Sequence, residues 1–132
     1  MSRLLSFLAL IMLFAGCQLA GPGVRDDDGN AAPPSDDLET LEAQIIELIG
    51  DAEASTIGQC AFIPFGSKPC GGPWRYLVYS TQTTNEATLE QYVARYNELD
   101  DARNRQEGLV SDCSLVGPPE IMLEGGQCQV RR

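Results

Sequence analysis

Histidine is absent from the 132 residues of this chain. Serine and cysteine nucleophiles are usually activated by a histidine, and many hydrolytic metal sites are built on histidine ligands. The sequence therefore excludes Ser–His and Cys–His nucleophile pairs and histidine-based metal hydrolase sites. Pairs of carboxylates remain, as glycosidases use them, but carboxylates this numerous usually form a solvated face. We expect a protein that is not an enzyme and has no catalytic residues.

Lysine is nearly absent, since Lys68 is the only one. Nine lysines and arginines stand against 19 aspartates and glutamates, and the formal net charge is −10. Proteins that bind nucleic acid gather basic side chains against the phosphates, whereas the arginines of this chain are scattered. We expect no nucleic acid among its partners. We also expect an anionic membrane surface to repel the domain.

The sequence also lacks an apolar run long enough to cross a bilayer, which takes about 20 residues. Its main apolar run, Leu4 to Phe14, is interrupted only by Ser6 and follows the basic Arg3. A positive start, a short apolar core and small residues after it are the anatomy of an export signal. Residues 1–16 are therefore expected to be a signal peptide.

The string that closes this run is Leu13-Phe14-Ala15-Gly16-Cys17. It resembles the lipobox of bacterial lipoprotein precursors, in which small residues precede the cysteine, although Phe14 stands where the family usually has leucine. The resemblance implies cleavage before Cys17, a diacylglyceryl group on its sulfur and acylation of the new amino group. Gln18, rather than aspartate, follows the cysteine, which implies delivery to the outer membrane in Gram-negative bacteria. The expected partner is thus the membrane of the bacterial cell envelope, held through the lipid on Cys17.

Four cysteines remain once Cys17 is set aside, an even number in an exported chain. An oxidising compartment favours two disulfides among them. A metal site of four thiolates is the alternative, but the sequence has no C-x-x-C pair and no histidine. We expect no metal and no cofactor.

The order of the expected elements favours one pairing of these cysteines. If the strand that ends near Ser80 leads through a long helix to a strand near Cys113, the two strands run parallel as a βαβ unit. Cys70 and Cys113 then lie toward the same end of the sheet, which leaves Cys60 for Cys128. A local bridge between Cys60 and Cys70 is the alternative, and it would require the intervening loop to fold back.

Three parts are expected after the signal peptide. Residues 18–35 hold three glycines, three prolines and the acidic run Asp26-Asp27-Asp28. With Cys17 they form a flexible tether, 17–35, because scarcely any residue there can anchor a core. Residues 36–132 are expected to form a single α+β domain.

The first helix of this domain is expected to begin at Asp36, an N-cap with Glu39 three residues on, and to end near Gly50. Its apolar residues recur at spacings of three and four: Leu38, Leu41, Ile45, Leu48 and Ala52. The stripe is expected to dock on its own domain, because a coiled-coil seam needs three or more heptads. A dimer seam is the alternative.

The second helix is expected to run from about Asn85 to Glu107 and to stop at Gly108. Thr83 and Glu86 have the spacing of a capping box. One face of this helix is apolar and includes both of its tyrosines: Leu89, Tyr92, Val93, Tyr96 and Leu99.

Short strands complete the domain. The runs 57–63 and 74–80 are β-branched and aromatic and predict a hairpin with a long loop. The tail segments 109–116, 120–123 and 127–130 predict two or three further strands between turn signals. The fold class is therefore α+β, a small disulfide-bridged domain with two helices and a short sheet.

The segment from Cys70 to Ser80, with Ser111-Asp112-Cys113 and Pro118-Pro119, is similar to a small cysteine-bridged domain of uncharacterised bacterial lipoproteins. The resemblance covers roughly residues 57–130. It implies that this region folds as one unit and implies no activity.

The loop 64–74 is the candidate binding loop, with Phe65, Lys68 and Trp74 as its candidate contact residues. The alternative is that the aromatic pair packs the end of the hairpin while Pro and Gly make the turns. The expected function is a binding or structural module of the envelope, whose partner would be an envelope protein. The alternative is an inhibitor of a protease or other hydrolase through this loop, although Pro69 after Lys68 disfavours a trypsin-like substrate mimic.

Overall fold

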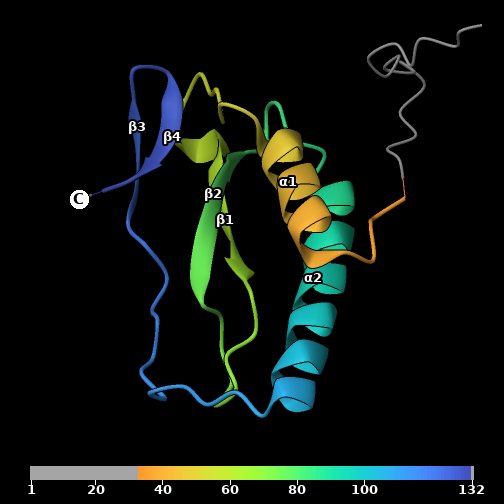
Figure 1. Cartoon of the computed structure of the whole chain (residues 1–132). Helices are drawn as coiled ribbons and strands as arrows, with labels where there is room; N and C mark the ends of the chain where they lie inside the picture. The colour runs from red at the N-terminus through yellow and green to blue at the C-terminus, as the bar shows by residue number, and fades with distance from the viewer. Residues whose placement is uncertain (1–32, 132) are drawn as a thin grey trace, which may run out of the picture. The chain divides into compact units, whose positions relative to one another are not determined.

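The computed structural model describes residues 33–131, and Figure 1 shows how its elements are arranged. In chain order they are helix α1 (Leu38–Ile49), a 3-10 turn (Ile57–Gln59), strands β1 (Cys60–Phe65) and β2 (Arg75–Ser80), helix α2 (Glu86–Glu107), and strands β3 (Ile121–Glu124) and β4 (Gln127–Val130). This is the α+β class that the sequence predicts. The expected signal peptide, Cys17 and the expected tether up to residue 32 lie outside the described residues.

Strands β1 and β2 form the expected antiparallel hairpin, with Cys60 opposite Ser80 and Phe65 opposite Arg75. Directly opposed residues share a face of the hairpin. One face therefore carries Ala61, Ile63 and Phe65 from β1 with Tyr79, Leu77 and Arg75 from β2. This face meets the two helices, which lie side by side along it (Figure 1).

The core forms between this face and the helices. Leu41 and Ile45 of α1 and Leu89 of α2 are completely buried. Tyr92 and Tyr96 are buried as well, with 3% and 8% of their surface exposed, which confirms the apolar face predicted for α2. The stripe of α1 thus docks on its own domain. Neither helix of residues 33–131 has both the length and the apolar character that crossing a membrane requires.

Both helices begin at a different cap from the one predicted. Asp37 caps α1, because its Oδ1 accepts from the Thr40 amide at 2.8 Å. Asn85 caps α2 in the same way, accepting from the Thr88 amide at 3.1 Å. The expected cap residue Asp36 is instead ion-paired with Arg95, 2.6 Å away.

Strands β3 and β4 form a second antiparallel hairpin, on the side of β1–β2 away from the helices (Figure 1). Strand β4 and the turn before it also pair with the chain after α1: the Cys128 amide donates to the Ala52 carbonyl at 2.9 Å, and the Ala54 amide donates to the Gly126 carbonyl at 2.8 Å. The Cys60–Cys128 disulfide joins β1 to β4.

Two expectations about the chain after α2 are wrong. Residues 109–120 contain no helix or strand, so the expected strand 109–116 does not form. The parallel βαβ unit is also absent from residues 33–131, because β2 pairs only with β1, antiparallel. The cysteines are nevertheless joined as expected, Cys60 to Cys128 and Cys70 to Cys113.

Candidate functional site

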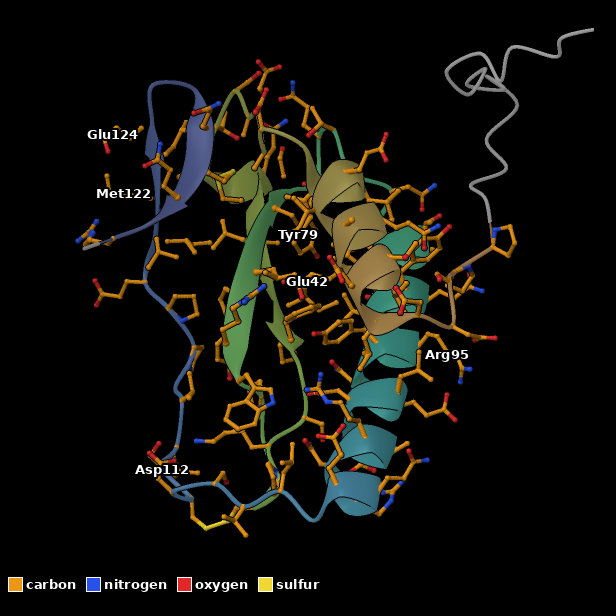
Figure 2. The ribbon with its side chains drawn as sticks, viewed as in Figure 1. Glu42, Tyr79, Arg95, Asp112, Met122 and Glu124 are labelled. Carbon is orange, nitrogen blue, oxygen red and sulfur yellow. A yellow bond between two sulfur atoms is a disulfide. The ribbon has the colours of Figure 1, made fainter. Side chains whose placement is uncertain are left out.

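Two irregular stretches meet at the end of the domain where α2 finishes. One is the hairpin loop 66–74, and the other is the segment 109–120. The Cys70–Cys113 disulfide joins them, and Figure 2 shows Asp112 beside a disulfide at this end. We call the two stretches together the braced site.

Lys68 is the centre of the braced site. Its side chain is buried, and the residue is only 5% exposed. Nζ donates to Asp112 Oδ1 at 3.0 Å, to the Ser114 carbonyl at 2.7 Å and to Ser114 Oγ at 3.1 Å. An ammonium has three donors, so all three are satisfied. The sequence predicts Lys68 to be a contact residue of the binding loop, which requires an accessible side chain. Its burial corrects this prediction.

Asp112 is the exposed partner of this buried cation, with 72% of its side chain accessible. The hydrogen bond from Lys68 lowers the pKa of Asp112 to about 2, with help from the Ser114 amide and hydroxyl, which also donate to this carboxylate. The carboxylate is therefore charged at any physiological pH.

A polar stripe on α2 holds the backbone of loop 66–74. Asn97 Oδ1 accepts from the Gly66 amide at 2.7 Å, and Asp100 Oδ2 accepts from the Ser67 amide at 2.8 Å. Asn104 Nδ2 donates to the Ser67 carbonyl at 2.5 Å. These three side chains fall at spacings of three and four, so they lie on one face of the helix.

Asp100 is the most buried member of the stripe, with 1% exposure. Its Oδ2 also accepts from Trp74 Nε1 at 3.0 Å, and its Oδ1 accepts from Arg103 at 2.5 Å. A buried carboxylate is tolerated when its lone pairs are filled by donors of this kind. One carboxylate thereby fixes both ends of loop 66–74.

The aromatic pair of the loop divides between core and surface. Phe65 is buried and stacks on Tyr96 with ring centroids 4.1 Å apart. Trp74 packs over Gly66, where an added Cβ would lie 2.5 Å from the indole Cδ1. Trp74 as a residue remains 43% exposed, and its ring lies 5.5 Å from Lys68 Nζ.

The candidate contact residues are therefore only partly available to a partner. Phe65 belongs to β1 and to the core, and Lys68 is buried beneath the segment 109–120. Trp74 alone of the three presents a large surface. The loop itself is shorter than expected, because Pro64 and Phe65 are strand residues.

The sequence argument missed Asp100 and Asn104, although a signal for them exists. The buried face of α2 passes through Leu89, Val93 and Tyr96 at spacings of four and three. The same rhythm continues to Asp100 and Asn104, both of which are buried. Polar residues on the continuation of an apolar face thus indicate buried side chains that hold another segment.

The segment 109–120 is the most exposed apolar part of the braced site. Val110 and Leu115 are 90% and 95% exposed. Leu109 and Val116, at 42% and 36%, are also open to solvent. Apolar side chains are thus displayed on a backbone that Lys68 and the disulfide hold in place.

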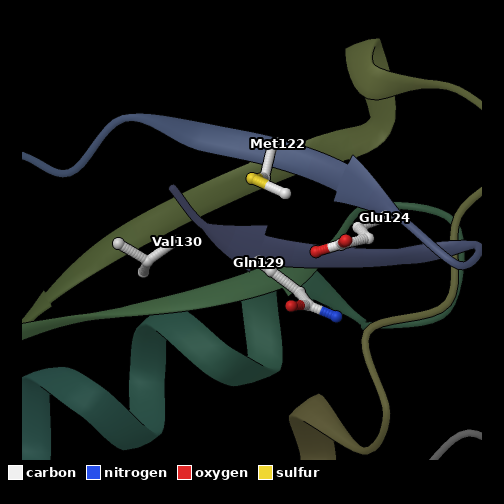
Figure 3. A pocket seen from close by; sticks show the side chains of 4 residues that line it. All are labelled: Met122, Glu124, Gln129 and Val130. Atoms are coloured by element: carbon white, nitrogen blue, oxygen red, sulfur yellow. The ribbon is translucent and has the colours of Figure 1, made fainter. Parts of the chain in front are cut away.

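One hollow of about 310 Å³ lies elsewhere, on the second hairpin (Figure 3). Met122, Glu124, Gln129 and Val130 line it. It brings together a single carboxylate and no cation, so it offers little chemistry. Within residues 33–131, no group of three or more Cys, Asp or Glu is placed to hold a metal ion.

Comparisons of the chain with protein-family models, with curated proteins and with solved structures found no match.

Proposed function

We propose that this protein is a lipid-anchored binding module of the bacterial cell envelope and that its braced site is the binding surface. The lipobox-like string at Cys17 supports the anchor and the outer-membrane location. The observation that carries the binding role is the exposure of Val110 and Leu115 on a segment fixed by a buried lysine and a disulfide.

Exposed apolar side chains are common on protein surfaces, and single ones need no explanation. The braced site differs because other groups hold its backbone in place, so its order does not depend on the exposed apolar side chains. Lys68 and Asp100, both buried charges, are used to hold loops and not to fill the core. A surface that is ordered before binding loses less entropy on association, so more of its contact energy appears as affinity.

The experiment is capture of envelope proteins by the full-length lipoprotein after crosslinking in intact cells. We expect Leu115→Asp and Val110→Asp to abolish capture of the principal partner, because a charge in an apolar contact is left without a counter-ion. Ile57→Asp is the matched control, since Ile57 is 52% exposed but lies at the 3-10 turn. Equal capture by all three variants and the parent would contradict the proposal.

A second candidate function is inhibition of a protease or other hydrolase. The burial of Lys68 argues against presentation of a lysine by loop 64–74. The exposure of Leu115 favours the neighbouring segment as the inhibitory one. This candidate is a special case of the binding module, in which the partner is a hydrolase.

A further inference from the structure

We infer that Ser114-Leu115-Val116 is an inhibitory segment for serine proteases that accept an apolar side chain, with Leu115 as the residue that enters the specificity pocket. This inference rests on the proposed function, because it names the class of partner that the braced site binds.

The first requirement of such a segment is access. A protease binds its target as an exposed chain that belongs to no helix or sheet. Residues 112–118 are all exposed and irregular. Leu115, with 95% of its surface accessible, is the most exposed of the large apolar residues in the part of the chain described here.

The second requirement is that the backbone be fixed before the enzyme arrives. The peptide carbonyl immediately before Leu115 belongs to Ser114, and Lys68 Nζ donates to it at 2.7 Å. Asp112 accepts from the Ser114 amide at 3.1 Å. The Cys70–Cys113 disulfide lies two residues before Leu115. The segment is thus supported from the protein side just before the apolar residue.

Rigidity on the other side comes from Pro118 and Pro119, whose rings fix their own φ angles. The chain turns sharply at Cys113, which has a φ of 53°. The surface offered to an enzyme therefore begins at Ser114. Leu115 lies at its centre.

The third requirement is that the peptide groups of the central residue be free. A serine protease binds the carbonyl of the target residue in its oxyanion hole. Among residues 33–131, the amide and the carbonyl of Leu115 make no hydrogen bond. Lys68 holds the neighbouring carbonyl of Ser114 instead, so it supports the segment without occupying these groups. Lys68 is in this sense a positioning residue.

The chemistry of the side chain selects the class of enzyme. Chymotrypsin-type specificity pockets are hydrophobic slots, whereas trypsin-type pockets carry an acidic group for lysine or arginine. Leucine fits the first and offers nothing to the second. The basic residue in reach, Lys68, is buried and ion-paired.

The test uses the full mature lipoprotein in detergent micelles with chymotrypsin, subtilisin and trypsin. We expect stoichiometric inhibition of chymotrypsin and subtilisin, no inhibition of trypsin, and an intact Leu115–Val116 bond by mass spectrometry. Leu115→Gly should weaken inhibition at least about 30-fold, as removal of a central interface residue does. Leu115→Lys should transfer inhibition to trypsin.

Two further variants separate positioning from general damage. Ile57→Gly, at an exposed position on the 3-10 turn outside the braced site, should leave inhibition unchanged. Lys68→Met should turn the protein from an inhibitor into a substrate cut after Leu115, while its far-UV circular dichroism still reports a folded domain. Rapid cleavage of the parent at Leu115–Val116, or no inhibition of either apolar-specific enzyme, would overturn the inference. If Leu115→Asp still abolished envelope capture in that case, the binding module would stand and only the protease would be wrong.

Discussion

Two buried charges, Lys68 and Asp100, explain most of the braced site at the scale of single residues. Each is nearly inaccessible, and each is hydrogen-bonded to groups from distant parts of the chain. A buried charge that loses its partners is far more costly than an exposed one. The two residues therefore control whether loop 66–74 and segment 109–120 are ordered.

Replacement of Asp100 should be much more damaging than replacement of its neighbour. Asp100→Asn keeps the shape of the side chain but replaces one of its two acceptor oxygens with an NH2 group. A donor then faces another donor in a buried place, so we expect a loss of about 3 kcal/mol in the free energy of unfolding. Asp101→Asn is the control, because Asp101 is half exposed and forms a surface pair with Arg105. That change should cost less than about 1 kcal/mol. Urea unfolding measures both, and equal losses would show that the polar stripe does not hold the loop.

Asp112 should make the stability of the domain depend on pH at the acidic end. Its pKa is lowered in the folded state from 3.8 to about 2. A lowered pKa means that the charged form stabilises the fold fully above about pH 4 and that this stabilisation is lost as the pH falls toward 2. We expect the difference in melting temperature between the parent and Asp112→Asn to be constant from pH 7 to pH 5 and to vanish near pH 2. A difference that does not change with pH would mean that the Lys68 contact is absent in solution.

At the scale of elements, the loop 66–74 owes its conformation to glycines with distinct tasks. Gly66 and Gly72 both have positive φ, 80° and 83°, which other residues rarely adopt. Only Gly66 also lies against a side chain, that of Trp74, whereas nothing lies within 4 Å of a Cβ added at Gly72. A comparison of substitutions at these two glycines thus distinguishes the effect of backbone strain from the effect of close packing.

Gly66→Ala should release the indole, while Gly72→Ala should not. Both variants strain the backbone, by roughly 1 kcal/mol or more, but only the first displaces Trp74 from its bond to Asp100. Trp74 is the only tryptophan of the chain, so its emission reports the change directly. We expect a red-shifted and more quenchable emission in Gly66→Ala and parent-like emission in Gly72→Ala. Identical spectra for the two variants would mean that the contact is unimportant.

Elements with local signals could be predicted from the sequence. The period of Leu89, Tyr92 and Tyr96 and the stop at Gly108 defined α2, and the run before Ser80 defined β2. The strand predicted for 109–116 is wrong. The apolar residues of this segment have the pattern of a strand, but they face solvent on a backbone that side chains hold in place. The burial of Lys68 could not be predicted, since its partner Asp112 is 44 residues away and no local pattern links them.

The cysteine pairing was correct although part of its reasoning was not. Cys70 and Cys113 do lie at one end of the domain, but α2 returns the chain there without a parallel strand. A long helix that packs along a hairpin thus constrains which cysteines can pair, even where the predicted strand order is wrong.

At the scale of the whole molecule, the charge is unevenly used. Every lysine and arginine of residues 33–131 is in an ion pair with a carboxylate. The acidic groups of the chain outnumber the basic ones, so a partner that approaches the protein meets a negative electrostatic field. Such a field favours partners with a basic rim and slows approach to anionic lipid, so a covalent lipid is the proposed means of staying at the membrane.

Loss of the proposed anchor should release the protein without unfolding it. Cys17 lies outside the expected domain, 36–132, and its proposed role is lipidation alone. We expect Cys17→Ser to be exported, to lose metabolic palmitate label and to leave the membrane fraction. Its melting temperature should match that of the parent domain. A labelled, membrane-bound Cys17→Ser protein would contradict the lipoprotein assignment.

The Cys60–Cys128 disulfide has a consequence for damage to the exposed segment. A cut after Leu115 would divide the chain into two pieces, with Cys70 and Cys113 both in the first. The second piece would still be attached, because Cys128 is bonded to Cys60 across the cut. In an oxidising compartment the nicked molecule would therefore stay one covalent body. It would separate into two bands only after reduction.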